Sequence, residues 1–110
     1  MKQHTAIYHG WRDGNGTAHV TADDKPLNAR FDLDNHSANG FEWGYAGSGP
    51  AQLALAMVAD ATGNDGLALR VHQHFKRKLI QHLDQESDWV ISAEQVREIA
   101  KQLAEELKIT

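Results

Sequence analysis

The sequence predicts an α+β fold in which a small antiparallel β-sheet packs against three α-helices. Residues 17–22 and 29–34 alternate apolar and polar side chains with the two-residue period of a half-buried strand. Residues 51–61 are apolar on all sides except at two polar positions, as in a buried helix. Apolar residues at three- and four-residue steps mark two further helices. A chain of 110 residues is expected to form a single domain, residues 1–110.

Three strands are expected in the first third of the chain. The first, Thr5–Trp11, is apolar on both sides, which favours a central place in the sheet. Asp13–Gly16 is a hairpin signal, because Gly and Asn tolerate positive φ, and it leads into a second strand, Thr17–Ala22. Asp23–Pro26 is expected to form a second turn. A third strand, Ala29–Leu33, then follows with one solvated face.

Two helices are expected in the middle of the chain. Pro50–Ala61 is the buried helix, with its N-cap in Ser48–Gly49, and proline is tolerated in its first turn. Leu67–Leu83 has an apolar face at four-residue steps and an N-cap in Asn64–Asp65.

Two further elements are expected near the C-terminus. Trp89–Ile91 is extended and is a candidate for a short fourth strand at the sheet edge. Ser92–Gln95 is a capping box, which opens a last helix whose apolar stripe continues to Leu107.

Composition and charge exclude several classes of protein. The chain has 41% hydrophobic and 24% charged residues, a net charge of −4 and no cysteine. The charge argues against a general nucleic-acid or anionic-membrane binder. The longest apolar run, Leu53–Ala59, is far shorter than the ~20 residues of a membrane span. Neither a disulfide nor a thiolate zinc site can form, and a cytoplasmic location is expected.

Residues 35–50 form the most unusual segment, a glycine-rich loop that carries Phe41, Trp43 and Tyr45. Two segments, Gly40–Tyr45 and Gly47–Ala56, resemble the signature GFEWGYGGSGPAQLALA. This signature is shared by a family of small uncharacterised proteins of bacteria, phages and plasmids. The resemblance extends to matching positions in four other places: Tyr8–His9–Gly10, Asn35–His36–Ser37, Phe75–Lys76 and Trp89. Ala46 and Ala38 depart from the Gly and Pro common in that family. The resemblance implies a domain of unknown function with an accessory role on mobile elements, and the family has no assigned activity that could be carried over to this chain.

Gly47, Ser48 and Gly49 stand at the predicted start of the buried helix. Free backbone N–H groups and the positive end of a helix dipole there would suit a phosphate or carboxylate. No lysine follows these glycines, as a Walker A loop would require, and Ala46 and Pro50 exclude a nucleophile elbow. The alternative is a purely structural turn into the helix.

Glu42, Trp43 and Tyr45 complete the set of candidate ligand-binding residues. Glu42 could point inward as a carboxyl of raised pKa, or it could accept hydrogen bonds from the loop's own N–H groups. Trp43 and Tyr45 could stack on a base or sugar, or they could anchor the loop to the core.

No metal site and no cofactor is expected, although the chain has seven histidines. There is no HExxH motif, and His72 and His74 point to different sides of a helix. Asp32, Asp34 and His36 could converge at the end of the third strand, but solvated side chains are the simpler interpretation. The basic cluster Lys76–Lys78 is interpreted in the same way.

These observations leave the function open between two main classes. The favoured hypothesis is a non-enzymatic accessory protein that binds an unknown protein or a small anionic ligand through the loop 36–50. The alternative is a small enzyme that uses Glu42, with His36 or His9, as acid and base over an anion at Ser48–Gly49. A purely structural dimer would also explain the aromatic residues.

Overall fold

Four antiparallel strands form one sheet in the computed structural model, which describes residues 6–108. The strands are β1 (Ile7–Arg12), β2 (Ala18–Ala22), β3 (Lys25–Pro26) and β4 (Trp89–Ser92). Their spatial order is β3-β2-β1-β4, so β1 is an interior strand and β4 an edge strand, as the sequence predicts. Thr5, the start of the predicted first strand, lies outside the described residues.

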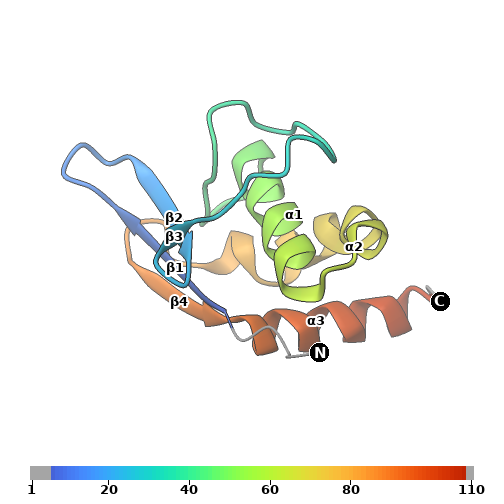
Figure 1. The fold of residues 1–110 in the computed structure, drawn as a ribbon. Helices are drawn as coiled ribbons and strands as arrows, with labels where there is room; N and C mark the ends of the chain where they lie inside the picture. The colour runs from blue at the N-terminus through green and yellow to red at the C-terminus, as the bar shows by residue number, and fades with distance from the viewer. Residues whose placement is uncertain (1–5, 109–110) are drawn as a thin grey trace.

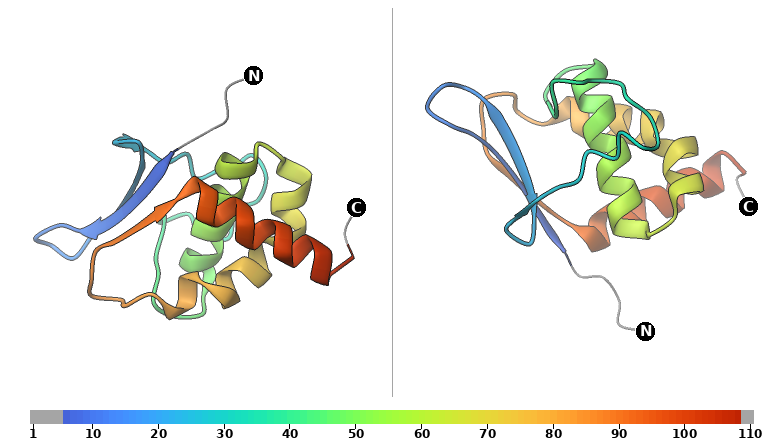
Figure 2. Two further views of the ribbon diagram at one scale, coloured as in Figure 1. Left: turned by 90° about the horizontal axis from the view of Figure 1, so that it is seen from below. Right: turned by 45° about the horizontal axis from the view of Figure 1, so that its top comes forward.

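Three α-helices and one 3₁₀ turn lie on one side of this sheet (Figures 1 and 2). They are α1 (Ser48–Thr62), α2 (Asp65–Lys78), η1 (Ile80–His82) and α3 (Ala93–Glu106). The predicted α+β fold is therefore confirmed. The second helix is shorter than predicted, because the chain leaves helical geometry at Leu79 and tightens into η1. None of the helices within residues 6–108 has the length and apolar character that a membrane span requires.

The predicted third strand at Ala29–Leu33 is wrong. Asp23 and Asp24 have positive φ angles of 51° and 68° and make a tight turn. Lys25–Pro26, expected to lie within that turn, therefore already pairs with β2 as β3. Arg30 has a φ of 61°, which is incompatible with a strand, and a turn follows it.

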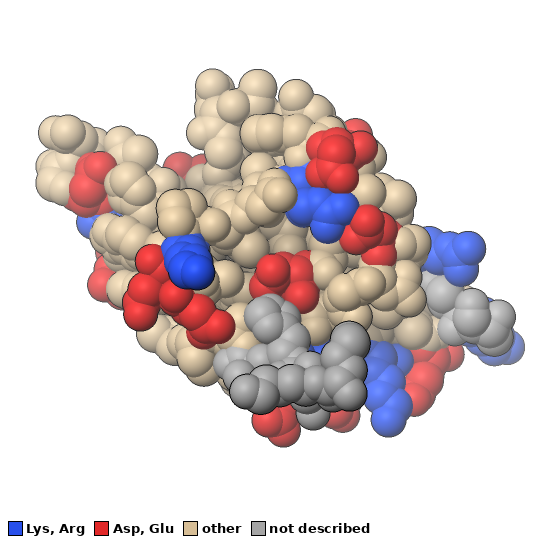
Figure 3. Space-filling view, viewed as in Figure 1, with Lys and Arg blue, Asp and Glu red and all other residues tan. Residues whose placement is uncertain are grey.

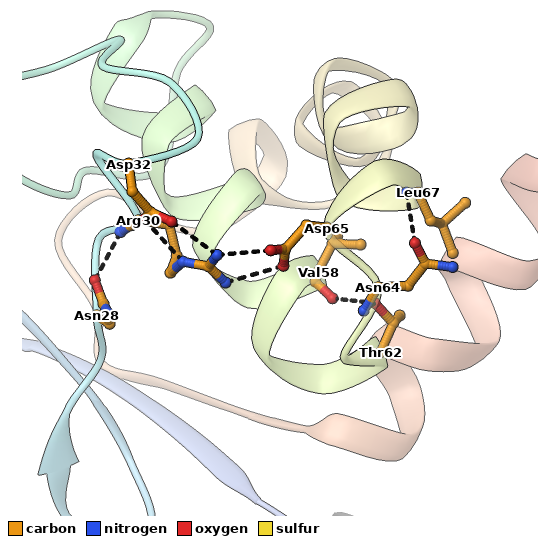
Figure 4. Close-up of polar contacts among 8 residues, drawn as sticks. All are labelled: Asn28, Arg30, Asp32, Val58, Thr62, Asn64, Asp65 and Leu67. Carbon is orange, nitrogen blue, oxygen red and sulfur yellow. Dashed lines mark hydrogen bonds and ion pairs between the residues drawn. The ribbon is translucent and has the colours of Figure 1, made fainter.

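Arg30 holds this irregular segment against helix α2 (Figure 4). Its guanidinium donates two hydrogen bonds to the carboxylate of Asp65, at 3.0 and 2.8 Å, and two to that of Asp32, both at 3.0 Å. The side chain of Asn28 accepts a hydrogen bond from the N–H of Arg30 at 2.9 Å. Charge-assisted hydrogen bonds of this kind are stronger than neutral ones, and here they override the alternating pattern that predicted a strand.

Side-chain caps begin α2 and α3, as the sequence predicts. Asn64 accepts a hydrogen bond from the N–H of Leu67 at 3.0 Å (Figure 4). Ser92 and Gln95 form a complete capping box, in which each side chain accepts from the other residue's backbone N–H, at 3.1 and 2.9 Å.

Helix α1 occupies the centre of the core. It packs against both α2 and α3, and every residue from Gly49 to Ala59 is buried. The sheet joins this core through Tyr8, which is fully buried and donates its hydroxyl to Asp60 of α1 at 2.6 Å. Burial raises the pKa of the Tyr8 hydroxyl, and the nearby carboxylate raises it further. Tyr8 therefore stays a neutral donor that links the sheet to the helix.

Candidate functional site

One buried side chain, Gln52 of α1, anchors the start of the glycine-rich loop. Gln52 is 0% exposed. Its oxygen accepts from the backbone N–H groups of His36 and Ser37, at 2.7 and 3.2 Å. Its amide nitrogen donates to the carbonyls of Ala29 and Asp34, at 2.7 and 3.1 Å. The oxygen accepts two hydrogen bonds and the nitrogen donates two, so the amide of Gln52 is fully satisfied by the segment that it holds against α1.

Glu42 pairs with Arg12, a residue 30 positions earlier that no local sequence pattern links to the loop. The Arg12 guanidinium donates to the two carboxylate oxygens of Glu42 at 2.7 and 3.2 Å, and to the carbonyl of Gln85 at 2.8 Å. The hydrogen bonds to Glu42 raise the pKa of Arg12. Glu42 therefore adopts neither of the two arrangements considered above. It serves as the acceptor of a bidentate ion pair between β1 and the loop.

Trp43 is buried, and the Arg12 guanidinium of this ion pair packs over its ring. Its side chain is 0% exposed, and the Arg12 guanidinium stands 4.5 Å from the centre of its ring. Trp89 meets the same indole edge-on, with ring centres 5.5 Å apart at 90°. Trp43 has no exposed face on which a ligand could stack, so it anchors the loop to the core.

The tip of the loop is formed by residues 44–48. Gly44 has a φ of 88° and donates its N–H to the carbonyl of Ile80 at 3.1 Å. A Cβ at Gly44 would lie 2.6 Å from the Cβ of Gln85, so a side chain fits neither the conformation nor the space. The ring of Tyr45 packs over Gly47 and remains 42% exposed. The loop is thus rigidly held at its base and presents Tyr45 at its surface.

Helix α1 begins without a side-chain cap, unlike α2 and α3. Its N-cap is Gly47, in extended geometry, and not Ser48 or Gly49 as predicted. Ser48 is exposed in the first turn, whereas Gly49 is buried against Glu42. The first turn contains no acidic residue. Its N–H groups therefore lack the side-chain acceptor that usually satisfies one of them.

A pair of histidines joins the loop to α2. The Nε2 atoms of His36 and His72 are 2.9 Å apart, and Asp34 places Oδ2 3.5 Å from the same atom of His36. The Nδ1 atom of His72 lies 2.9 Å from the carbonyl of Ala68, which can only accept, so Nδ1 carries a proton. The neutral ring of His72 then accepts through Nε2, and His36 is the donor.

His72 should make the free energy of unfolding depend on pH. Burial lowers the pKa of His72 below its ordinary value of 6.5, and the neighbouring His36 contributes in the same direction. The unfolded chain then binds this proton more readily than the folded chain, so the free energy of unfolding should fall as the pH drops below 6.5. Thermal melts between pH 8 and pH 5 should show a flatter dependence for His72→Gln, whose amide does not titrate. His74→Gln is the matched control on the same helix, and an equal flattening in that variant would contradict the assignment.

The remaining charged candidates are separated from one another. Asp32 pairs with Arg30, so of the two aspartates predicted to converge with His36, Asp34 alone lies close to it. Within residues 6–108 no group of three histidine or acidic side chains is placed to hold a metal ion. In the basic cluster, Lys78 lies 3.7 Å from Glu106 of α3, so that charge is already countered.

Glu42 and the two histidines named with it do not converge. His36 hydrogen-bonds to His72, and His9 lies 3.8 Å from Asp88. Successive residues of a strand point to opposite faces, so His9 and Arg12 stand on different sides of β1, and Glu42 is on the side of Arg12.

The fold and this site define a small α+β protein with an aromatic, glycine-rich loop that Gln52 and Arg12 brace against the core. The chain belongs to a family of unknown function, DUF6166, whose profile matches residues 8–102. No curated protein and no solved structure matches the chain.

Proposed function

We propose that this protein is a non-enzymatic binding protein whose loop 36–50 holds an anionic group of a small ligand or macromolecular partner. The observation that carries the proposal is the exposed tip of the loop, where Tyr45 and Ser48 flank a helix start without a side-chain cap. α1 is 15 residues long, and its dipole places partial positive charge at this end. Backbone N–H groups and two hydroxyls could together donate to a phosphate or carboxylate.

The surroundings of the tip favour a bound anion. Glu42 is the single acidic residue of the loop 36–50, and its charge is countered by Arg12 at 2.7 Å. Ser48 is exposed at the start of α1, so a ligand can reach its hydroxyl, whereas Tyr45 covers Gly47 and Glu42 covers Gly49. Trp43 and Gln52 hold the loop base in place, so little ordering is needed on binding.

The enzymatic alternative has weaker support. It requires Glu42 and a histidine to act on the same bound molecule. Glu42 is held by Arg12, His36 is bound to His72, and His9 lies across β1. The accessory role on phages and plasmids and the cytoplasmic location also remain proposals. They rest on the resemblance of the loop and on the absence of cysteine.

Amide chemical shifts recorded during a titration with inorganic phosphate, and separately with AMP, test the proposal. The amides of residues 44–52 are expected to shift first. Ser48→Ala is a clean probe because Ser48 makes no cap hydrogen bond, so stability should not change. The apparent dissociation constant should rise by roughly two- to tenfold, the contribution of one hydrogen bond. Tyr45→Phe is expected to act in the same direction.

Gln102→Ala is the control, since Gln102 is an exposed polar residue of α3, outside the loop and the first turn of α1. Its binding should equal that of the parent protein. Shifts confined to residues 70–78, with the loop silent, would reject this site in favour of the basic segment of α2. The absence of any shift with either probe would reject the anion site altogether.

A further inference from the structure

The face of the sheet that points away from the helices is uncovered along the described chain (Figure 2). The pairings Trp11↔His19, His9↔Thr21 and His9↔Val90 place these side chains together on that face. Ile7 and Val90 add apolar surface to it, with exposed fractions of 46% and 64%. We name this surface the outer sheet face; its residues are Ile7, His9, Trp11, His19, Thr21 and Val90.

Three rings form a continuous stack across the outer sheet face. Trp11 lies between His9 and His19, with ring centres 4.9 and 5.3 Å away and interplanar angles of 27° and 19°. Carboxylates stand at both ends of this stack. Asp88 lies 3.8 Å from Nε2 of His9, and Asp13 lies 2.8 Å from Nε2 of His19. The surface therefore offers π-faces beside negative charge.

The rim of this face is acidic. Asp13 follows β1, Asp23 and Asp24 form the β2–β3 turn, and Glu86 and Asp88 precede β4. The strands and these turns contain two basic residues, Arg12 and Lys25. Lys25 is the one whose positive charge could balance the acidic side chains of the rim. Arg12 points inward and is bound by Glu42. Acidic side chains also gather beside the strands on the side of the molecule seen in Figure 3.

This charge pattern selects among possible occupants. A nucleic acid or an anionic membrane would meet like charges, and so would a second copy of this chain with the same rim. A basic protein segment is complementary to it. Arginine suits the surface better than lysine, because a planar guanidinium can stack on a ring and bind a carboxylate at the same time. The inner face of the same sheet contains this combination, with Arg12 over Trp43 and bidentate on Glu42.

We propose that the outer sheet face docks an arginine-containing basic segment of a partner protein. The guanidinium stacks on the half-exposed ring of His9 or His19 at an end of the stack and pairs with Asp88 or Asp13. Ile7 and Val90 contact the aliphatic part of the segment. This surface lies on the opposite side of β1 from Glu42 and the loop 36–50, so the inference does not depend on the anion site.

The full chain can be titrated with a fluorescent decapeptide of alternating arginine and glycine, using citrulline–glycine and lysine–glycine peptides for comparison. The arginine peptide is expected to bind most tightly, and higher salt should weaken it because the attraction is electrostatic. Its amide shifts should map to β1, β2 and Val90. Trp11→Ala removes the middle ring, on which His9 and His19 both stack, and should weaken binding by roughly two- to thirtyfold, the range of one cation–π contact. Asp88→Asn should weaken it without affecting the fold.

Glu98→Gln is the matched control, since it removes an exposed carboxylate from α3 at a distance from this face. It should bind the peptide like the parent protein. If Glu98→Gln weakens peptide binding as much as Asp88→Asn does, the attraction is a general effect of charge and the proposal is wrong. Unchanged peptide binding in both Trp11→Ala and Asp88→Asn would also overturn it. Binding of a single-stranded oligonucleotide at this face, or a concentration-dependent dimer abolished by Trp11→Ala, would overturn it in favour of another occupant.

Discussion

Leu55→Ala is expected to lower the free energy of unfolding by about 2–5 kcal/mol, because it leaves a cavity in the centre of the core. Leu55 is 0% exposed, and so are the residues on either side of it in α1. A helix buried on all sides has no mobile surface that could move in to fill the space. Denaturant or thermal unfolding monitored by circular dichroism measures the loss.

Leu69→Ala is the matched control for this substitution. Leu69 lies on α2 with 42% of its surface exposed, so the same change of side chain should cost much less there. A loss of stability in Leu69→Ala as large as that in Leu55→Ala would contradict the central position of α1.

The local signals in the sequence predict most of the secondary structure. The stretch at 51–61, apolar but for two residues, predicts α1, the capping box at Ser92 predicts α3, and the glycine and asparagine at residues 14–16 predict the first hairpin. Each of these signals acts within a few residues, so it can be interpreted without knowledge of the tertiary fold. The error at Ala29–Leu33 has the opposite origin. Arg30 bonds to Asp65, 35 positions later, and no local pattern indicates that pairing.

The candidate site was predicted only in part for the same reason. Its loop and the helix that follows it are marked by glycine, proline and aromatic residues, which act locally. Its supports are distant in sequence. Arg12 reaches Glu42 across 30 positions, and His36 reaches His72 across 36. These contacts depend on how β1, the loop and α2 pack, which periodicity does not determine.

Gln52 is the one support of the loop that the sequence around it does indicate. An amide in a helix that is otherwise apolar must be hydrogen-bonded when it is buried, since an unpaired buried amide is costly. That rule predicts partners for Gln52 but does not name them. The structure identifies them as backbone groups of residues 29–37, the segment that enters the loop.

Replacement of Gln52 by leucine, a side chain of similar size, should therefore both destabilise the protein and release the loop. Four backbone groups would lose their hydrogen bond to Gln52, and the two bonded most closely, both at 2.7 Å, are the N–H of His36 and the carbonyl of Ala29. Two unsatisfied groups of this kind cost on the order of 2–6 kcal/mol together.

Hydrogen exchange measured by mass spectrometry or NMR separates these two effects. Amides of residues 35–40 should exchange much faster in Gln52→Leu, while those of α3 should change only as far as global stability changes. Gln102→Leu, at an exposed position of α3, is the matched control and should leave both the melt and the exchange of the loop unaltered. If Gln52→Leu keeps full stability and slow exchange at His36 and Ser37, the loop is held by Arg12 and Trp43 alone. The bracing role assigned to Gln52 would then be wrong.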